Sequence, residues 1–163
     1  MNKTLITGLL ALIILGGVWW FGKNESTESP DSVSNENAVL GNEIVTIYKS
    51  SSCGYCGVYA QYLDRENVLT KVENVTDMSA IKKEHGIPPQ LESCHTSLVG
   101  GYFIEGHVPL SVIERLLAEK PDITGIALPG MPSGSPGMPG PQTEPWVIYA
   151  IQRDGSVTEF MTI

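Results

Sequence analysis

The sequence lacks the patterns on which several common enzyme classes depend. It contains no Walker loop, no dinucleotide-binding glycine pattern, no Ser-His-Asp arrangement and no internal repeat. Hydrolase and nucleotide-dependent functions therefore have no support. Positive charge is also scarce, since 10 Lys and Arg stand against 18 Asp and Glu, for a formal net charge of −8. Nucleic acid is not expected as a partner, because domains that bind it carry clustered Lys and Arg.

Cysteine is also scarce. The chain has 3 cysteines, Cys53, Cys56 and Cys94. Three thiols cannot all pair within one chain, so at least one is free or pairs with another molecule. None of them lies near the apolar N-terminal segment, which argues against a bacterial lipoprotein.

The N-terminal segment, residues 5–21, is almost wholly apolar and lies between Lys3 and Lys23. It is long enough to cross most of a bilayer, and it ends in paired tryptophans without a small-x-small cleavage site. We therefore predict a membrane anchor over residues 1–23, with a cleaved signal peptide as the alternative. A short N-terminus before a single span usually stays inside. The rest of the chain would then face the periplasm from a bacterial inner membrane, or be exported if the segment is cleaved.

Residues 24–41 are rich in Ser, Asn and Glu without apolar periodicity, which predicts a disordered acidic linker. Residues 42–163 are predicted to form one α/β domain. Apolar spacing predicts strands at 43–48, 70–75, 94–99 and 102–104, and helices at 57–66, 78–85 and 109–120. Ser51 or Ser52 can cap the first helix. The order β-α-β-α-β-β-α, with Cys-x-x-Cys after the first strand, matches the thioredoxin-like fold.

The C-terminal part follows a different pattern. Residues 125–145 are rich in Gly and Pro and predict a long functional or disordered loop. Residues 146–152 and 157–161 flank Asp154-Gly155, which predicts a β-hairpin at the sheet edge or as a small annex.

The candidate site is the Cys-x-x-Cys pair at the start of the first helix. A helix N-terminus supplies free N–H groups and positive dipole, which favour the thiolate form of Cys53 and Cys56. Cys94 lies at the entry to the third strand, which in a thioredoxin-like layout runs against that helix start, so we expect its sulfur near the pair. An inert disulfide is the alternative for the pair. For Cys94 the alternatives are a buried small side chain and a disulfide partner.

Four further side chains are weaker candidates for metal ligands. His95 follows Cys94, and strand neighbours point to opposite faces, so both reach one point only if the loop bends. His107 precedes Pro109 at a turn and is either a cap or a site residue. Met131 and Met138 are soft donors in the Gly/Pro-rich loop, where they either pack on the core or form a lid over a soft metal ion.

From residue 48 to residue 138 the sequence resembles a bacterial family of CopG-type copper-resistance proteins, long catalogued as a domain of unknown function. The matching stretches are Tyr48-Lys49-Ser50-Ser51-Ser52-Cys53-Gly54, Gly86-Ile87-Pro88-Pro89, Ser93-Cys94-His95-Thr96, Gly100-Gly101-Tyr102, Ile104-Glu105-Gly106-His107-Val108-Pro109 and Leu128-Pro129-Gly130-Met131-Pro132-x-Gly134-Ser135-Pro136-Gly137-Met138. The family is thioredoxin-like and exported, and it binds Cu(I) through clustered cysteines. The family pattern is Cys-Gly-Cys-Cys, whereas this chain has Tyr55 in place of the middle thiol. A cluster needing four thiolates is therefore in doubt, and one Cu(I) on two or three sulfurs is not.

The resemblance implies a metal-binding protein rather than an enzyme, with Cu(I) on Cys53, Cys56 and Cys94. A copper exporter or a periplasmic copper carrier is the implied partner. Zinc on these thiols and His95 is the alternative ion. The alternative function is a thiol-disulfide oxidoreductase in which Cys53 attacks and Cys56 resolves. A structural module with a permanent disulfide is the third hypothesis.

Overall fold

The computed structural model describes residues 38–163. The predicted anchor, residues 1–23, and residues 24–37 of the predicted linker lie outside the described residues. Between residues 38 and 163, no helix combines the length and apolar character needed to cross a membrane.

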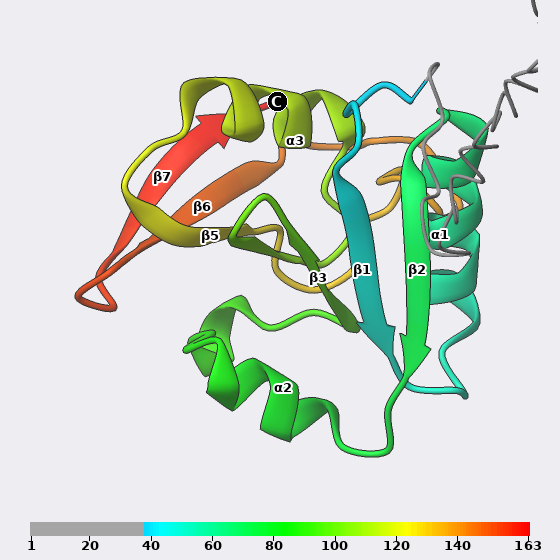
Figure 1. Ribbon diagram of the computed structural model, residues 1–163, viewed down its shortest axis with the longest axis horizontal. Helices are drawn as coiled ribbons and strands as arrows, with labels where there is room; N and C mark the ends of the chain where they lie inside the picture. The colour runs from blue at the N-terminus through cyan, green and yellow to red at the C-terminus, as the bar shows by residue number, and fades with distance from the viewer. Residues whose placement is uncertain (1–37) are drawn as a thin grey trace, which may run out of the picture. The chain divides into compact units, whose positions relative to one another are not determined.

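The described part of the chain is a mixed α/β domain with one sheet of seven strands and three α-helices (Figure 1). The strands are β1 (Ile44–Lys49), β2 (Leu69–Asn74), β3 (His95–Val99), β4 (Tyr102–Glu105), β5 (Ile123–Ala127), β6 (Val147–Gln152) and β7 (Val157–Thr162). The helices are α1 (Gly54–Arg65), α2 (Met78–Glu84) and α3 (Leu110–Glu119), with a short 3-10 turn, η1 (Pro89–Leu91). The predicted order β-α-β-α-β-β-α is confirmed from β1 to α3.

The sheet has the strand order β2-β1-β3-β4-β5-β6-β7. β1 pairs in parallel with β2, and α1 makes the crossover that a parallel pair requires. α3 makes the same kind of connection between β4 and β5. β3 pairs antiparallel with both β1 and β4. The predicted hairpin is β6 and β7, and it continues the sheet beyond β5 instead of forming a separate annex.

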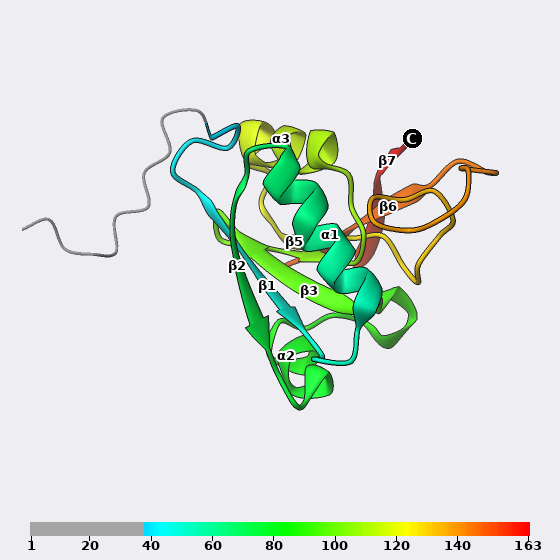
Figure 2. The same ribbon diagram turned by 90° about the vertical axis from the view of Figure 1, so that its right-hand side faces the viewer.

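Two apolar clusters cover the two faces of the sheet. Ile104 and Ile126 belong to the larger cluster, which includes the buried faces of α1 and α3. Their strand neighbours Phe103 and Ala127 belong to the smaller cluster. Since successive strand residues point to opposite faces, the sheet is covered on both sides. Figure 2 shows α1 lying across β1 and β3 on the side of the larger cluster.

Two local features differ from the sequence-based expectation. β5 was not predicted, and Gly125 to Ala127 belong to this strand and not to the Gly/Pro-rich loop. Helix α1 begins earlier than predicted, and its N-cap is Cys53 and neither Ser51 nor Ser52, because the Cys53 sulfur accepts a hydrogen bond from the Cys56 N–H at 3.3 Å.

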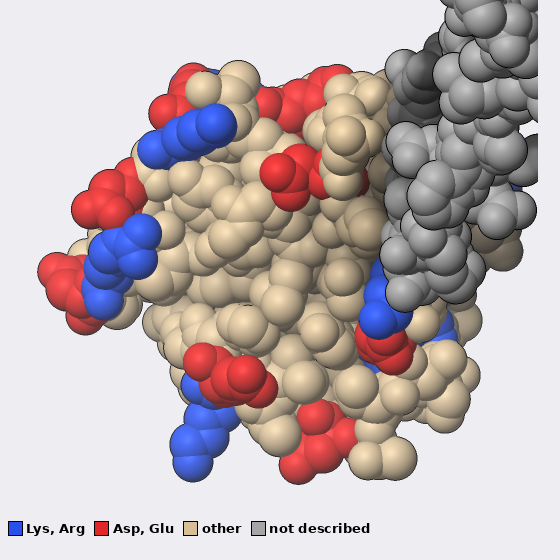
Figure 3. All heavy atoms as spheres, in the orientation of Figure 1, with Lys and Arg blue, Asp and Glu red and all other residues tan. Residues whose placement is uncertain are grey.

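The charged side chains are mostly exposed and mixed in sign. On the face shown in Figure 3 acidic and basic side chains are interspersed around the edge, and the centre is largely uncharged. Residues 38–163 form four ion pairs, three of which are exposed. Such exposed pairs contribute little to stability. The fourth joins Lys82 and Glu105 and is buried.

We predict that Gly125→Ala destabilises the domain. A Cβ at this position in β5 would lie 2.3 Å from the Phe103 carbonyl oxygen and 2.5 Å from its ring, so the free energy of unfolding should fall by about 1–3 kcal/mol. Gly57→Ala in α1 is the control, because no heavy atom lies within 4 Å of its Cβ and a helical Gly→Ala change stabilises by roughly 0.5–1 kcal/mol. Urea denaturation measures both. Equal stability of the two variants would contradict the close approach of β4 and β5.

Candidate metal centre

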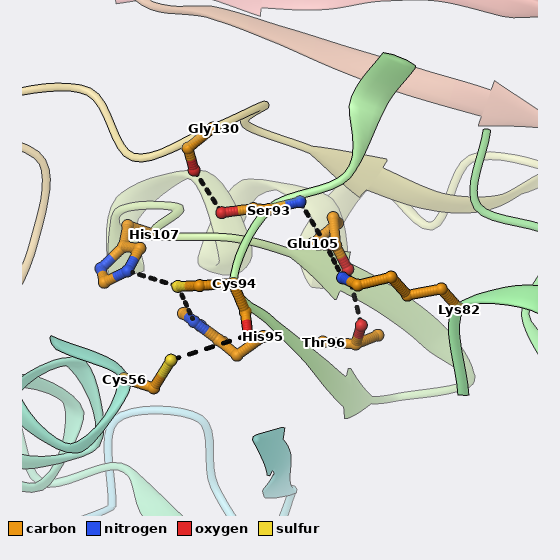
Figure 4. Close-up of polar contacts among 9 residues, drawn as sticks. All are labelled: Cys56, Lys82, Ser93, Cys94, His95, Thr96, Glu105, His107 and Gly130. Atoms are coloured by element: carbon orange, nitrogen blue, oxygen red, sulfur yellow. Dashed lines mark hydrogen bonds and ion pairs between the residues drawn. The ribbon is translucent and has the colours of Figure 1, made fainter. Parts of the chain in front are cut away.

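The candidate site lies where the start of α1 meets two loops, as Figure 4 shows. Cys53 follows β1 and caps α1, and Cys56 is in the first turn of the helix. Cys94 directly precedes β3, and His107 lies between β4 and α3. The β1–β3 pairing brings the entry to β3 beside the end of β1. Residues separated by up to 54 positions therefore converge through strand order.

The three sulfur atoms form the first group of potential ligands. The Sγ atoms of Cys53, Cys56 and Cys94 all lie within 4.8 Å of one another. Cys53 and Cys56 form a disulfide, and Cys94 is a free thiol. The Cys56 sulfur also lies 3.7 Å from the Cys94 carbonyl oxygen. In this oxidised state one thiol is available, and reduction of the disulfide makes three available at one place.

Two imidazoles and Cys94 form the second group, whose ligand atoms also lie within 4.8 Å of one another. The Cys94 sulfur is 3.4 Å from His95 Nδ1 and 3.1 Å from His107 Nε2. The Cys94 sulfur and the His95 ring can meet because Cys94 lies before the first residue of β3. The alternation of side chains along a strand therefore does not apply to Cys94. The bend that the sequence-based argument required is present.

A backbone carbonyl fixes the orientation of His107. Its Nδ1 lies 2.7 Å from the carbonyl oxygen of Pro136. A carbonyl oxygen can only accept, so Nδ1 carries the hydrogen and the Nε2 lone pair faces Cys94. Metal-binding histidines are usually oriented in this way by a hydrogen bond at the other ring nitrogen.

Tyr59 of α1 supports both imidazole rings. Its ring centroid lies 4.6 Å from that of His95 and 5.3 Å from that of His107. Its hydroxyl donates to the Val108 carbonyl at 2.8 Å, so the buried polar end has a partner. Gly137 lies directly against Tyr59, and a Cβ there would be 2.8 Å from the Tyr59 backbone nitrogen. Only glycine allows the loop that carries Pro136 to come this close.

Burial controls the protonation of the site. It lowers the pKa of His95 well below the usual value, and the nearby His107 and Lys82 lower it further. Burial also lowers the pKa of His107, although the hydrogen bond to Pro136 opposes the shift. The pKa of the Cys94 thiol is raised, mainly by burial. Both imidazoles are therefore neutral at neutral pH, which is the form that binds metal ions.

His95 Nε2 is buried and has no hydrogen-bond partner. An unsatisfied buried nitrogen costs about 1–3 kcal/mol. The opposite nitrogen of the same ring faces Cys94.

The remaining candidates are partly or largely exposed to solvent. Met131 is 47% exposed, and Met138 is half-buried, two residues after Pro136. Tyr55, which replaces the family's middle cysteine, is 48% exposed in the first turn of α1. It therefore does not fill a buried space left by the missing thiol.

Sequence reasoning missed two features of the site. Tyr59 has the spacing of an ordinary apolar residue in its helix, and its contacts with two histidines have no sequence signature. The ion pair of Lys82 and Glu105 was also missed, although the charge of Glu105 directly after Tyr102-Phe103-Ile104 was a usable signal of a buried carboxylate.

Comparison with known proteins assigns the family. No curated protein matches the chain at a significant level. A family model described as "Protein of unknown function, DUF411" matches residues 91–138, which include Cys94, His95 and His107. Cys53 and Cys56 lie outside the matched residues.

Two solved structures, described as forms 2 and 1 of copper resistance protein CopG, are similar to the chain. Form 2 is 33% identical with a TM-score of 0.69, over 74% of this chain and 98% of that one. Form 1 is 33% identical with a TM-score of 0.68, over 74% of this chain and 96% of that one. The similarity in sequence and fold extends over almost the whole of CopG, and the chain therefore belongs to the CopG-type copper-resistance family.

Proposed function

We propose that this protein binds Cu(I) outside the cytoplasm and sequesters it or transfers it to a partner. The convergence of Cys53, Cys56 and Cys94, with all three sulfurs within 4.8 Å, carries the proposal. Soft thiolate ligands favour Cu(I) over harder ions. Membership of a copper-resistance family supports the same ion.

The ligand set favours one ion over a larger cluster. The site supplies three sulfurs, because Tyr55 stands where the family pattern has one further cysteine. The Tyr55 side chain is exposed. The two neutral imidazoles can complete the coordination, and Met138 of the Gly/Pro-rich loop is a further soft donor in the proposal. Zn(II) on the three thiolates and His95 is the alternative occupant.

The oxidised and reduced states have different binding capacities. In the disulfide state Cys94 is the one thiol at the site. Reduction adds two electrons and two protons to the disulfide and yields two further thiols, which lose their protons when they bind the ion. The thiol redox state would therefore control loading and release.

The fold and the proposed membrane anchor fit a protein that exchanges Cu(I) with a partner outside the cytoplasm. The strand order β2-β1-β3-β4 with α1 following β1 fits a thioredoxin-like domain. Residues 1–23 would anchor the domain in the inner membrane and residues 24–41 would link the two, so that the site faces the periplasm. A copper exporter or soluble copper carrier could then exchange the ion with the site through soft ligands.

We predict that Cys94→Ser lowers the Cu(I) affinity of the reduced protein by at least a hundredfold, since even indirect supports of metal ligands contribute roughly 10–100-fold. Anaerobic titration against a colorimetric Cu(I) chelator measures the affinity, and repetition with Zn(II) tests the alternative ion. Ser51→Ala, an exposed change beside the site, is the control and should bind as the parent does. Cu(I) binding that is indifferent to Cys94 would rule out the three-sulfur site.

We further predict that the reduced protein binds one Cu(I) tightly and that the disulfide form binds it at least a hundredfold more weakly, because oxidation removes two of the three sulfurs. The same chelator competition, performed on fully oxidised and fully reduced samples, measures the difference. Equal affinity in the two states would show that Cys53 and Cys56 are not ligands.

A thiol-disulfide oxidoreductase is the second candidate, because the Cys53–Cys56 disulfide stands at a helix N-terminus. Cys53 is partly exposed and could attack a substrate, whereas Cys56 is buried and could resolve the mixed disulfide. The position before β3, where thioredoxins have a substrate-binding proline, is occupied by Cys94. We predict little reductase activity towards a model disulfide. Turnover that is abolished by Cys53→Ser would instead favour this candidate.

A further inference from the structure

We propose that the buried ion pair of Lys82 and Glu105 positions Cys94 and His95 for metal binding. The inference rests on the proposed function, and it assigns positioning roles to two residues that do not belong to the ligand set. Glu105 ends β4 and is fully buried, and Lys82 reaches it from α2. Figure 4 shows the pair behind the Cys94 loop, on the side away from Cys56.

The Glu105 carboxylate binds the chain on both sides of the Cys94–His95 dipeptide. The backbone N–H of Ser93, which precedes the dipeptide, donates to Oε1 at 2.6 Å. The hydroxyl of Thr96, which follows it, donates to Oε2 at 2.6 Å. Lys82 Nζ also donates to Oε1 and neutralises the charge. One carboxylate therefore fixes both ends of the segment that carries two candidate ligands.

The same carboxylate is connected, through Ser93, to the Gly/Pro-rich loop whose Pro136 carbonyl orients His107. Ser93 donates from its hydroxyl to the Gly130 carbonyl, and the Gly130 N–H donates to the Glu92 carbonyl at 3.1 Å. Gly130 begins the segment whose Pro136 carbonyl orients His107. The backbone of Glu105 adds a further link, because its carbonyl accepts from the Leu128 N–H at 3.0 Å. Loss of the Glu105 carboxylate would therefore act directly on the Cys94–His95 segment and, through Ser93 and Gly130, on the loop that orients His107.

The burial of this pair points to a positioning role. Of the four ion pairs among residues 38–163, it is the one that is buried, with side-chain exposures of 6% for Lys82 and 0% for Glu105. Removal of two charges from water is costly, and a well-packed apolar replacement is often as stable or more so. A carboxylate offers what an apolar pair cannot, namely several acceptor positions that bind two donors flanking Cys94 as well as Lys82.

The test uses the full chain and the double variant Lys82→Met/Glu105→Gln, which removes both charges and so leaves no unpaired buried ion. The first measurement is the alkylation rate of Cys94 by iodoacetamide in the disulfide form, where Cys94 is the one free thiol among residues 38–163. The second is the Cu(I) affinity of the reduced form, and the third is the unfolding temperature. Tyr102→Phe is the matched control, because it removes a hydrogen bond to Pro121 at the other end of β4.

We expect the double variant to alkylate at least tenfold faster and to bind Cu(I) at least tenfold more weakly, with an unfolding temperature close to that of the control. The control should change neither the alkylation rate nor the affinity. An unchanged alkylation rate in the folded double variant, or a faster rate with unchanged Cu(I) affinity, would overturn the positioning role. If the double variant does not fold, Thr96→Val removes one of the hydrogen bonds alone and must change both measurements in the same direction.

The two proposals fail in distinguishable ways. The alkylation rate requires no metal, so it tests the placement of Cys94 even if the parent protein does not bind Cu(I). Absence of Cu(I) binding by the parent would refute the proposed function. Equal alkylation rates in parent and double variant would refute the placement by Glu105.

Discussion

The Glu105 carboxylate lies beyond the reach of solvent, and much of the site's geometry follows from the partners that such a charge requires. A buried carboxylate is stable only with a counter-charge and with donors to its oxygens. Lys82 supplies the charge, and Ser93 and Thr96 supply the donors. Because these donors flank Cys94 and His95, satisfying the carboxylate also fixes the place of two potential metal ligands. Helix α2 is coupled to the site in this way although it contributes no ligand to either group.

The site combines a redox-variable part with a constant part. Cys53 and Cys56 form the disulfide, whereas the contacts of the Cys94 sulfur with the two imidazoles and of His107 with Pro136 do not involve it. Tyr59 packs against both of these imidazoles, and burial lowers their pKa values so that they are neutral at neutral pH. Reduction of the disulfide would therefore add two sulfur donors beside these contacts without breaking them. This property suits a protein that accepts and releases an ion.

The sequence predicted those features that depend on local pattern. Apolar spacing placed the elements from β1 to α3, and Asp154-Gly155 placed the final hairpin. β5 was missed because Thr124-Gly125-Ile126 contains a glycine and runs into a Gly/Pro-rich loop, so only its pairing with β4 and β6 reveals it. The early start of α1 was missed because cysteine is not among the usual capping residues. The predicted strand order was enough to expect Cys94 near Cys53. The partners of Glu105 could not be predicted, because they come from elements far apart in the sequence that no local spacing connects.

The substitution at Tyr55 shows how the scaffold limits what one residue can change. In the first turn of α1 this position is 48% exposed. A cysteine there would be an additional thiol donor, reached from solvent. Its replacement by Tyr removes that donor and leaves Cys53, Cys56, Cys94 and the imidazoles in place. Tyr55 therefore lowers the number of thiols available near the proposed site and leaves the convergence of the three sulfurs intact, because the Cys94 segment is held through the contacts of Glu105 with Ser93 and Thr96.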